Sequence, residues 1–263
     1  MAVIVVVPDP DTDAGLPRIA AALVSSLRAV RGQVPAADRI TVVEFADLRA
    51  RPESGPIPVE GLALERSVLE GWWSAAVRTG QGRGEAVPDA ATALRGTAHF
   101  SRQPKPPAGG AAQLRRYLTD RKYRHELRDR TQGCIGAETQ VVVGHGLGGL
   151  IAYETLCAVS DSVAVTLVTL GPALCGPRVV FDLLEPPPRN NQGDWPAAVR
   201  HWFNIVAQTD VTALSRPQLT ARFGPGIEDL MIEPRSVTDS LSTYLLDRST
   251  GLAVATGLSA EFR

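Results

Sequence analysis

Continuous runs of β-branched and aliphatic residues recur along the chain and predict buried strands. The first run covers Val3 to Val7, and a shorter one covers Ile40 to Phe45. Runs without polar alternation are typical of strands that helices cover on both faces. Later strands are expected from Gln140, over 163–170, over 202–206 and, despite two acidic residues within it, over 227–232. Together these segments predict the strands of one mostly parallel sheet.

Between these runs, apolar residues return at helical spacing and predict the connecting helices. Ile19, Leu23 and Leu27 share one face of a helix after the first strand. A helix over 62–77 and one charged helix over 113–130 are expected before the central strand. Four further helices are expected after it, one that follows the glycine-rich corner and ends near residue 159, and three over 179–184, 240–246 and 249–258. The alternation of strands and helices predicts a doubly wound α/β fold in a single domain over residues 1–263.

The segment from residue 51 to 110 interrupts this alternation. It is rich in glycine and proline, as in Gly80-Gln81-Gly82-Arg83-Gly84. Its predicted helix carries Trp72 and Trp73, which we expect to line a pocket or to pack on the core. Ligands of doubly wound sheets bind at the carboxyl ends of the strands. We therefore interpret 51–110 as an insertion or lid above those ends.

A glycine-rich corner joins the central strand to its helix and reads Gly144-His145-Gly146-Leu147-Gly148-Gly149. It resembles the nucleophile elbow G-x-S-x-G, in which a tight turn lifts a serine to the top of a sheet. The tracts RRYLTDRKYRHELRDR before it and HWFNIVAQTDVTAL after it extend the likeness. Over nearly its whole length the chain resembles a bacterial lipase- and esterase-like α/β-hydrolase family. This resemblance implies an α/β-hydrolase-like fold with a lid.

The resemblance also places the family's catalytic positions on this chain. Asp210 stands where the family has its acid, but Gly146 replaces the serine. Pro8-Asp9 replaces the histidine-glycine pair of the oxyanion loop, and Thr238 lies where the histidine is expected. Serine attack needs a nucleophile, an imidazole and oriented N–H donors together. We therefore predict a degenerate triad and no serine hydrolase activity.

Two functions remain open for such a site. The first is a non-catalytic protein that binds a small apolar ligand or a protein partner in the old cleft. The residues expected around that cleft and its oxyanion loop are Pro8, Asp9, Leu147 and Gly148. The second is a cyclase- or lyase-type enzyme that uses Asp210 or His145 as acid or base. A lesser alternative is nucleotide or phosphate binding at the glycine-rich turn, whose backbone amides begin a helix.

The other chemically active residues have simpler interpretations. His99, His125 and His201 are expected in surface or structural roles, and Cys157 and Cys175 as buried, unreactive thiols. The aspartates at 9, 11 and 13 are expected to form a helix-capping loop and not a metal site. No cofactor or metal is predicted.

Composition adds limits on the class of partner. The 263 residues contain 27 basic and 28 acidic side chains, a net charge of -1, which gives no reason to expect nucleic acid as a partner. Three cysteines without C-x-x-C spacing indicate neither a disulfide framework nor a structural zinc site. The apolar start ends at Pro8, too short for a signal peptide or a membrane span. We expect a cytoplasmic protein.

Overall fold

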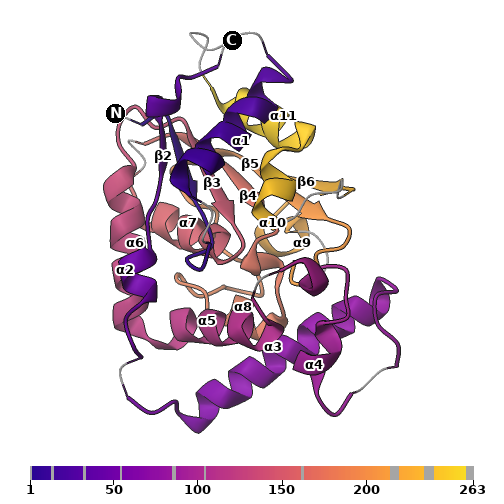
Figure 1. The fold of residues 1–263 in the computed structure, drawn as a ribbon. Helices are drawn as coiled ribbons and strands as arrows, with labels where there is room; N and C mark the ends of the chain where they lie inside the picture. The colour runs from indigo at the N-terminus through magenta and orange to yellow at the C-terminus, as the bar shows by residue number, and fades with distance from the viewer. Residues whose placement is uncertain are drawn as a thin grey trace.

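The computed structural model describes residues 2–12, 15–31, 34–53, 55–84, 87–103, 105–160, 163–213, 219–233 and 240–258. Within these ranges one parallel sheet of six strands has the order β2-β1-β3-β4-β5-β6 (Figure 1). The strands are β1 (Ile4–Val7), β2 (Ile40–Val42), β3 (Val141–His145), β4 (Val165–Leu170), β5 (Val199–Ala207) and β6 (Ile227–Ile232). The α/β class predicted from the hydrophobic runs is confirmed.

Helices pack on both faces of this sheet, because successive side chains of a buried strand point to opposite sides. Val6 enters one hydrophobic core and Val5 the other. The first core is closed by α1 (Leu16–Arg28), α10 (Ser240–Leu245) and α11 (Arg248–Gly257). The second contains residues of α3 (Val59–Arg78), α5 (Pro107–Thr119), α6 (Arg121–Cys134) and α7 (Leu147–Ala158). Figure 1 shows α3 on the side of the molecule opposite α1 and α11.

Short elements complete the described chain. The short α-helices are α2 (Ala46–Arg49), α4 (Ala90–Leu94), α8 (Arg178–Asp182) and α9 (Thr220–Phe223). The short 3-10 helices are η1 (Ala37–Arg39), η2 (Phe100–Arg102) and η3 (Ala173–Cys175). The segment 51–110 contains α3, α4, η2 and the first turn of α5.

The prediction of one charged helix over 113–130 was wrong in one respect, because two helices occupy this part of the chain. Asp120 has an extended backbone between them, at φ -92° and ψ 94°. Its side chain accepts a hydrogen bond from the backbone N–H of Tyr123 at 3.1 Å. Asp120 therefore ends α5 and caps the N-terminus of α6, a role in which aspartate is strongly preferred.

The strand order indicates where a doubly wound sheet of this kind would bind a ligand. The chain runs from β1 outward to β2 and then returns to place β3 on the other side of β1. Doubly wound sheets bind ligands outside the carboxyl ends of the strands at such a reversal. The loops after β1 and β3 therefore meet at the expected place.

Candidate functional site

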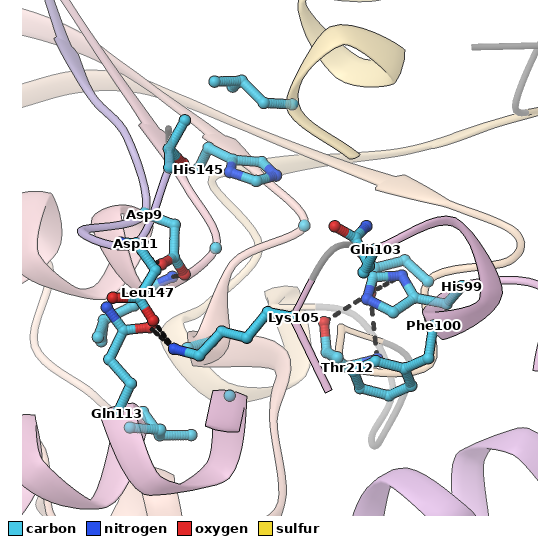
Figure 2. A pocket seen from close by; sticks show the side chains of 18 of the residues that line it. Asp9, Asp11, His99, Phe100, Gln103, Lys105, Gln113, His145, Leu147 and Thr212 are labelled. Atoms are coloured by element: carbon cyan, nitrogen blue, oxygen red, sulfur yellow. Dashed lines mark hydrogen bonds and ion pairs between the residues drawn. The ribbon is translucent and has the colours of Figure 1, made fainter. Parts of the chain in front are cut away.

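A cavity of about 350 Å³ opens at the carboxyl ends of the strands (Figure 2). Its apolar wall includes Trp72, Phe100, Leu114, Leu147 and Leu241. Its polar wall includes Asp9, Asp11, His99, Lys105, Gln113, His145 and Asp210. The side chains from residues 72 and 99–114 come from the 51–110 segment and the adjoining helix α5. This segment therefore forms much of one wall of the cavity.

The glycine-rich corner makes a sharp turn from β3 into α7. Gly146 has φ 58° and ψ -124°, a conformation that side-chain-bearing residues rarely adopt. A Cβ on Gly144 would lie 2.6 Å from the Cα of Gly149, and one on Gly148 would lie 2.1 Å from the carbonyl oxygen of Val7. These glycines bring strand and helix together. Gly148 packs against the backbone of Val7 and the buried Pro8, whereas Gly146 lines the cavity.

The Asp9 carboxylate lies directly at this corner. Its Oδ2 accepts a hydrogen bond from the backbone N–H of Leu147 at 3.2 Å, at the N-terminus of α7. A Cβ on Gly146 would lie 2.9 Å from the same oxygen. Helix N-termini attract anions. Here the chain's own carboxylate takes that place and crowds the space in which a serine side chain at position 146 would begin.

Lys105 is the basic partner of the aspartates. Its Nζ forms an ion pair with Oδ2 of Asp11 and donates a hydrogen bond to Oε1 of Gln113 at 3.0 Å. Burial lowers the pKa of Lys105 below its usual value, and the negative charge of Asp9 opposes that shift. Figure 2 shows the amine pointing toward the aspartates across the cavity.

Asp210, after β5, receives donors on both carboxylate oxygens. The Tyr244 hydroxyl donates to Oδ2 at 2.7 Å, and the backbone N–H of Thr212 donates to Oδ1 at 3.1 Å. Burial, and then the charge of Asp210, raises the pKa of Tyr244 well above its usual value. Gly171 permits this packing, since a Cβ there would lie 2.5 Å from Oδ2 of Asp210. Asp210 is therefore held firmly beside the cavity.

His99 was expected in a surface or structural role, and the structure places it away from the surface, in the wall of the cavity. Its Nδ1 lies 3.2 Å from Oδ1 of Asp210, and its side chain is 11% exposed. A neutral imidazole whose Nδ1 proton faces this carboxylate has Nε2 as its acceptor nitrogen, and no hydrogen bond of Nε2 occurs within the described residues. The inference that Asp210 lacks a histidine is therefore wrong. The 51–110 segment supplies the imidazole, while Thr238 lies outside the described residues.

His145 and the two tryptophans have different positions around the cavity. His145 lines it and packs on Tyr244, with ring centroids 5.7 Å apart. Trp72 also lines the cavity, whereas Trp73 packs beside Gly82. Both tryptophans are buried. Only one of the pair is thus placed to contact a ligand.

The remaining candidates lie elsewhere. His125 is exposed beside Asp129, and His201 is exposed on β5. Burial raises the pKa of Cys157 and of Cys175 to about 12, so neither thiol is readily ionised at neutral pH.

Three further findings concern metal sites, membrane-spanning helices and similar proteins. Among the described residues, no group of three or more His, Cys, Asp or Glu side chains is arranged to hold a metal ion. No helix among them is long and apolar enough to cross a membrane. Comparison with protein-family models, curated proteins and solved structures found no match.

Proposed function

We propose that this chain is a degenerate α/β-hydrolase-like protein whose cavity binds a small, mainly apolar and uncharged ligand, and that it is not a serine hydrolase. One observation carries the proposal. The Asp9 carboxylate accepts the hydrogen bond of the Leu147 N–H, which an oxyanion would need. The same carboxylate crowds the space that a serine side chain at position 146 would need. The cavity is otherwise open, with an apolar wall suited to a small molecule.

The sharp turn at Gly146 is the best support for the hydrolase-like part of the proposal. The strand order alone also suits other doubly wound folds. A positive φ at Gly146, directly between β3 and α7, supports the interpretation as a nucleophile elbow, which has the same strand-turn-helix order. Asp210 after β5 and a wall formed by the 51–110 segment, acting as a lid, agree with the same interpretation.

The carboxylates beside the glycine-rich turn favour an uncharged ligand over a phosphate at this position. An anion at the N-terminus of α7 would replace or approach the Asp9 carboxylate, with Asp11 close by. At about 4 Å and an effective dielectric of about 20, one such like-charge contact costs roughly 4 kcal/mol. The open cavity also favours a small ligand over a protein partner, which would need an exposed apolar surface.

A pair of fluorescent probes tests ligand binding directly. N-phenylnaphthylamine is neutral, whereas anilinonaphthalene sulfonate has similar rings and a negative charge. We expect saturable binding of the neutral probe and much weaker binding of the sulfonate. Trp72→Ala should weaken binding of the neutral probe roughly tenfold, because an apolar contact surface is lost. Trp73→Ala removes an equally large buried side chain outside the cavity and is the matched control. Equal effects of the two substitutions would place the probe elsewhere.

A second experiment tests the degenerate elbow with a fluorophosphonate probe. The natural protein and Gly146→Ser alone should remain unlabelled, since Asp9 blocks the new hydroxyl. The double variant Asp9→Gly, Gly146→Ser should gain labelling, and adding His99→Gln should remove it. Labelling of the natural protein, or none of the double variant, would contradict the elbow interpretation.

The contact between His99 and Asp210 favours a second candidate function, a non-hydrolytic enzyme that moves a proton. His145 packs on Tyr244, whereas His99 has a carboxylate on Nδ1 and Nε2 beside the cavity. That arrangement suits a general base, for which positioned side chains typically contribute about 10²- to 10⁴-fold. A cyclase- or lyase-type reaction begins with such a proton transfer.

Nitrobenzisoxazole tests this candidate, because a base that removes its ring proton breaks the N–O bond and releases a coloured cyanophenolate. We expect turnover above the buffer rate, lost in His99→Gln and retained in His125→Gln, whose histidine is exposed. Turnover equal to that of buffer would remove the enzymatic candidate and leave ligand binding.

A further inference from the structure

Lysine is rare in this chain, and one of its lysines lies in the cavity. Of the 27 basic residues only Lys105 and Lys122 are lysines, and all the others are arginines. Lys122 is exposed on α6. An arginine forms ion pairs with aspartates at least as well as a lysine does, but it cannot lose its proton or act as an amine nucleophile. The lysine beside the cavity therefore suggests amine chemistry.

The Lys105 side chain is directed into the cavity by its surroundings. Its aliphatic part lies against α5 at Gly109, where a Cβ would be 2.9 Å from Cε of Lys105. Gln113 accepts a hydrogen bond from Nζ at 3.0 Å, and Asp11 forms an ion pair with the same atom. Figure 2 shows His99 and Phe100 on the other side of the cavity. A ligand in the cavity therefore lies within reach of a fixed amine.

We propose that Lys105 captures an aldehyde or ketone group of the cavity's apolar ligand as a Schiff base. This inference rests on the proposed ligand-binding function and names the reactive group of the ligand. Partial burial of Lys105 favours the free amine, which is the nucleophile in this reaction, and Asp11 lies in place to accept the released proton. The pKa of Lys105, which burial lowers from its usual value, agrees with a larger share of free amine.

The reaction needs no oxidant or reductant. The ammonium of Lys105 gives a proton to Asp11, and the amine lone pair then attacks the carbonyl carbon. The resulting carbinolamine loses its oxygen as water, and a C=N bond remains. Of the three protons of the ammonium, two leave with the water and one stays on the iminium nitrogen. Asp9 and Asp11 are placed to carry these protons between nitrogen and oxygen.

Naphthaldehyde and naphthylmethanol are matched probes for this proposal, because only the aldehyde forms an imine. The full chain is incubated with naphthaldehyde and cyanoborohydride, which reduces an imine to a stable amine, and is then mapped by mass spectrometry. We expect one naphthylmethyl adduct on Lys105 in the natural protein and in Lys122→Arg. Lys105→Arg should lose it, and excess naphthylmethanol should reduce it by competition. Displacement of N-phenylnaphthylamine measures non-covalent binding of both probes.

The outcomes separate the two proposals. If both probes displace the dye and Lys105 gains no adduct, the ligand-binding function stands and the Schiff base is wrong. Equal labelling of Lys105 and Lys122, or labelling that naphthylmethanol does not reduce, would show general amine reactivity and overturn the inference. If neither probe displaces the dye and no adduct forms, the inference is wrong, and saturable binding of the dye itself still decides the ligand-binding function.

Discussion

Two clusters of charged side chains in this molecule differ in what surrounds them. Glu154 of α7 is fully buried and accepts hydrogen bonds from the Tyr117 hydroxyl at 2.6 Å and from Nε of Arg124 at 2.9 Å. The backbone N–H of Glu185 donates to it at 3.0 Å. The cluster of Asp9, Asp11 and Lys105 instead lines a cavity. Carboxylates paired with basic side chains are thus enclosed by protein around Glu154 and accessible from the cavity around Lys105.

The difference separates a structural role from a chemical one. Protein donors use both carboxylate oxygens of Glu154, which joins α5, α6 and α7. Such a closed network has no place for a ligand. The amine of Lys105 lies beside the cavity, and the neighbouring carboxylates of Asp9 and Asp11 can accept and donate protons. Substitutions in the closed cluster should therefore change stability, whereas those at the cavity should change binding.

Breaking the closed cluster should have the largest effect on stability. Glu154→Gln leaves the buried Arg124 charge without its carboxylate, a change that typically costs about 3 to 5 kcal/mol. Urea unfolding should show this loss, while probe affinity of the folded fraction stays unchanged. Glu185→Gln is the control, because Glu185 contacts the same Arg124 but its side chain is 46% exposed. It should cost no more than about 1 kcal/mol. Equal costs would contradict the distinction.

Tyr244 contacts both the buried sheet and a residue of the cavity wall, and loss of its hydroxyl should have an intermediate effect on stability. Its hydroxyl accepts the backbone N–H of Ala207 at 2.9 Å and donates to Asp210 at 2.7 Å. Tyr244→Phe leaves a buried N–H without a partner, which costs about 1 to 3 kcal/mol. Urea unfolding measures the loss. If Asp210 orients His99 as the base, turnover of nitrobenzisoxazole should also fall in Tyr244→Phe, because Asp210 loses the hydroxyl that holds it. A stability loss without any kinetic change would limit Tyr244 to a structural role.

The sequence predicted what depends on local pattern. The β-branched runs found the sheet, and the run over Ile227–Ile232 matches β6 residue for residue. The glycines at 144 and 146 indicated the turn, because close approach and positive φ both demand glycine. The break at Asp120 was also readable, since an aspartate is a preferred N-cap, but the charged residues on both sides obscured it.

The cavity wall was harder to predict, because it depends on contacts distant in sequence. His99 and Asp210 are separated by 111 positions, and the segment around His99 has neither helical nor strand periodicity. The position of Asp9 after the first strand was clear. Its hydrogen bond to Leu147, by contrast, depends on how β1 lies beside β3. The scarcity of lysine was the one available signal for Lys105.

Removing the amine from the cavity should have the smallest effect on stability, and that effect should depend on pH. In Lys105→Met we expect a change of no more than about 1 kcal/mol at neutral pH, because a partly exposed ion pair contributes little. The folded pKa of Lys105 lies below its ordinary value of 10.5. As pH rises between these two values, the folded chain loses this proton first and the unfolded chain holds more protons, so the natural protein gains stability. Lys105→Met lacks this gain. Urea midpoints of both proteins, measured from neutral pH toward 10.5, should therefore diverge in favour of the natural protein. Parallel midpoints would mean that Asp11 keeps the amine of the folded chain protonated over this range.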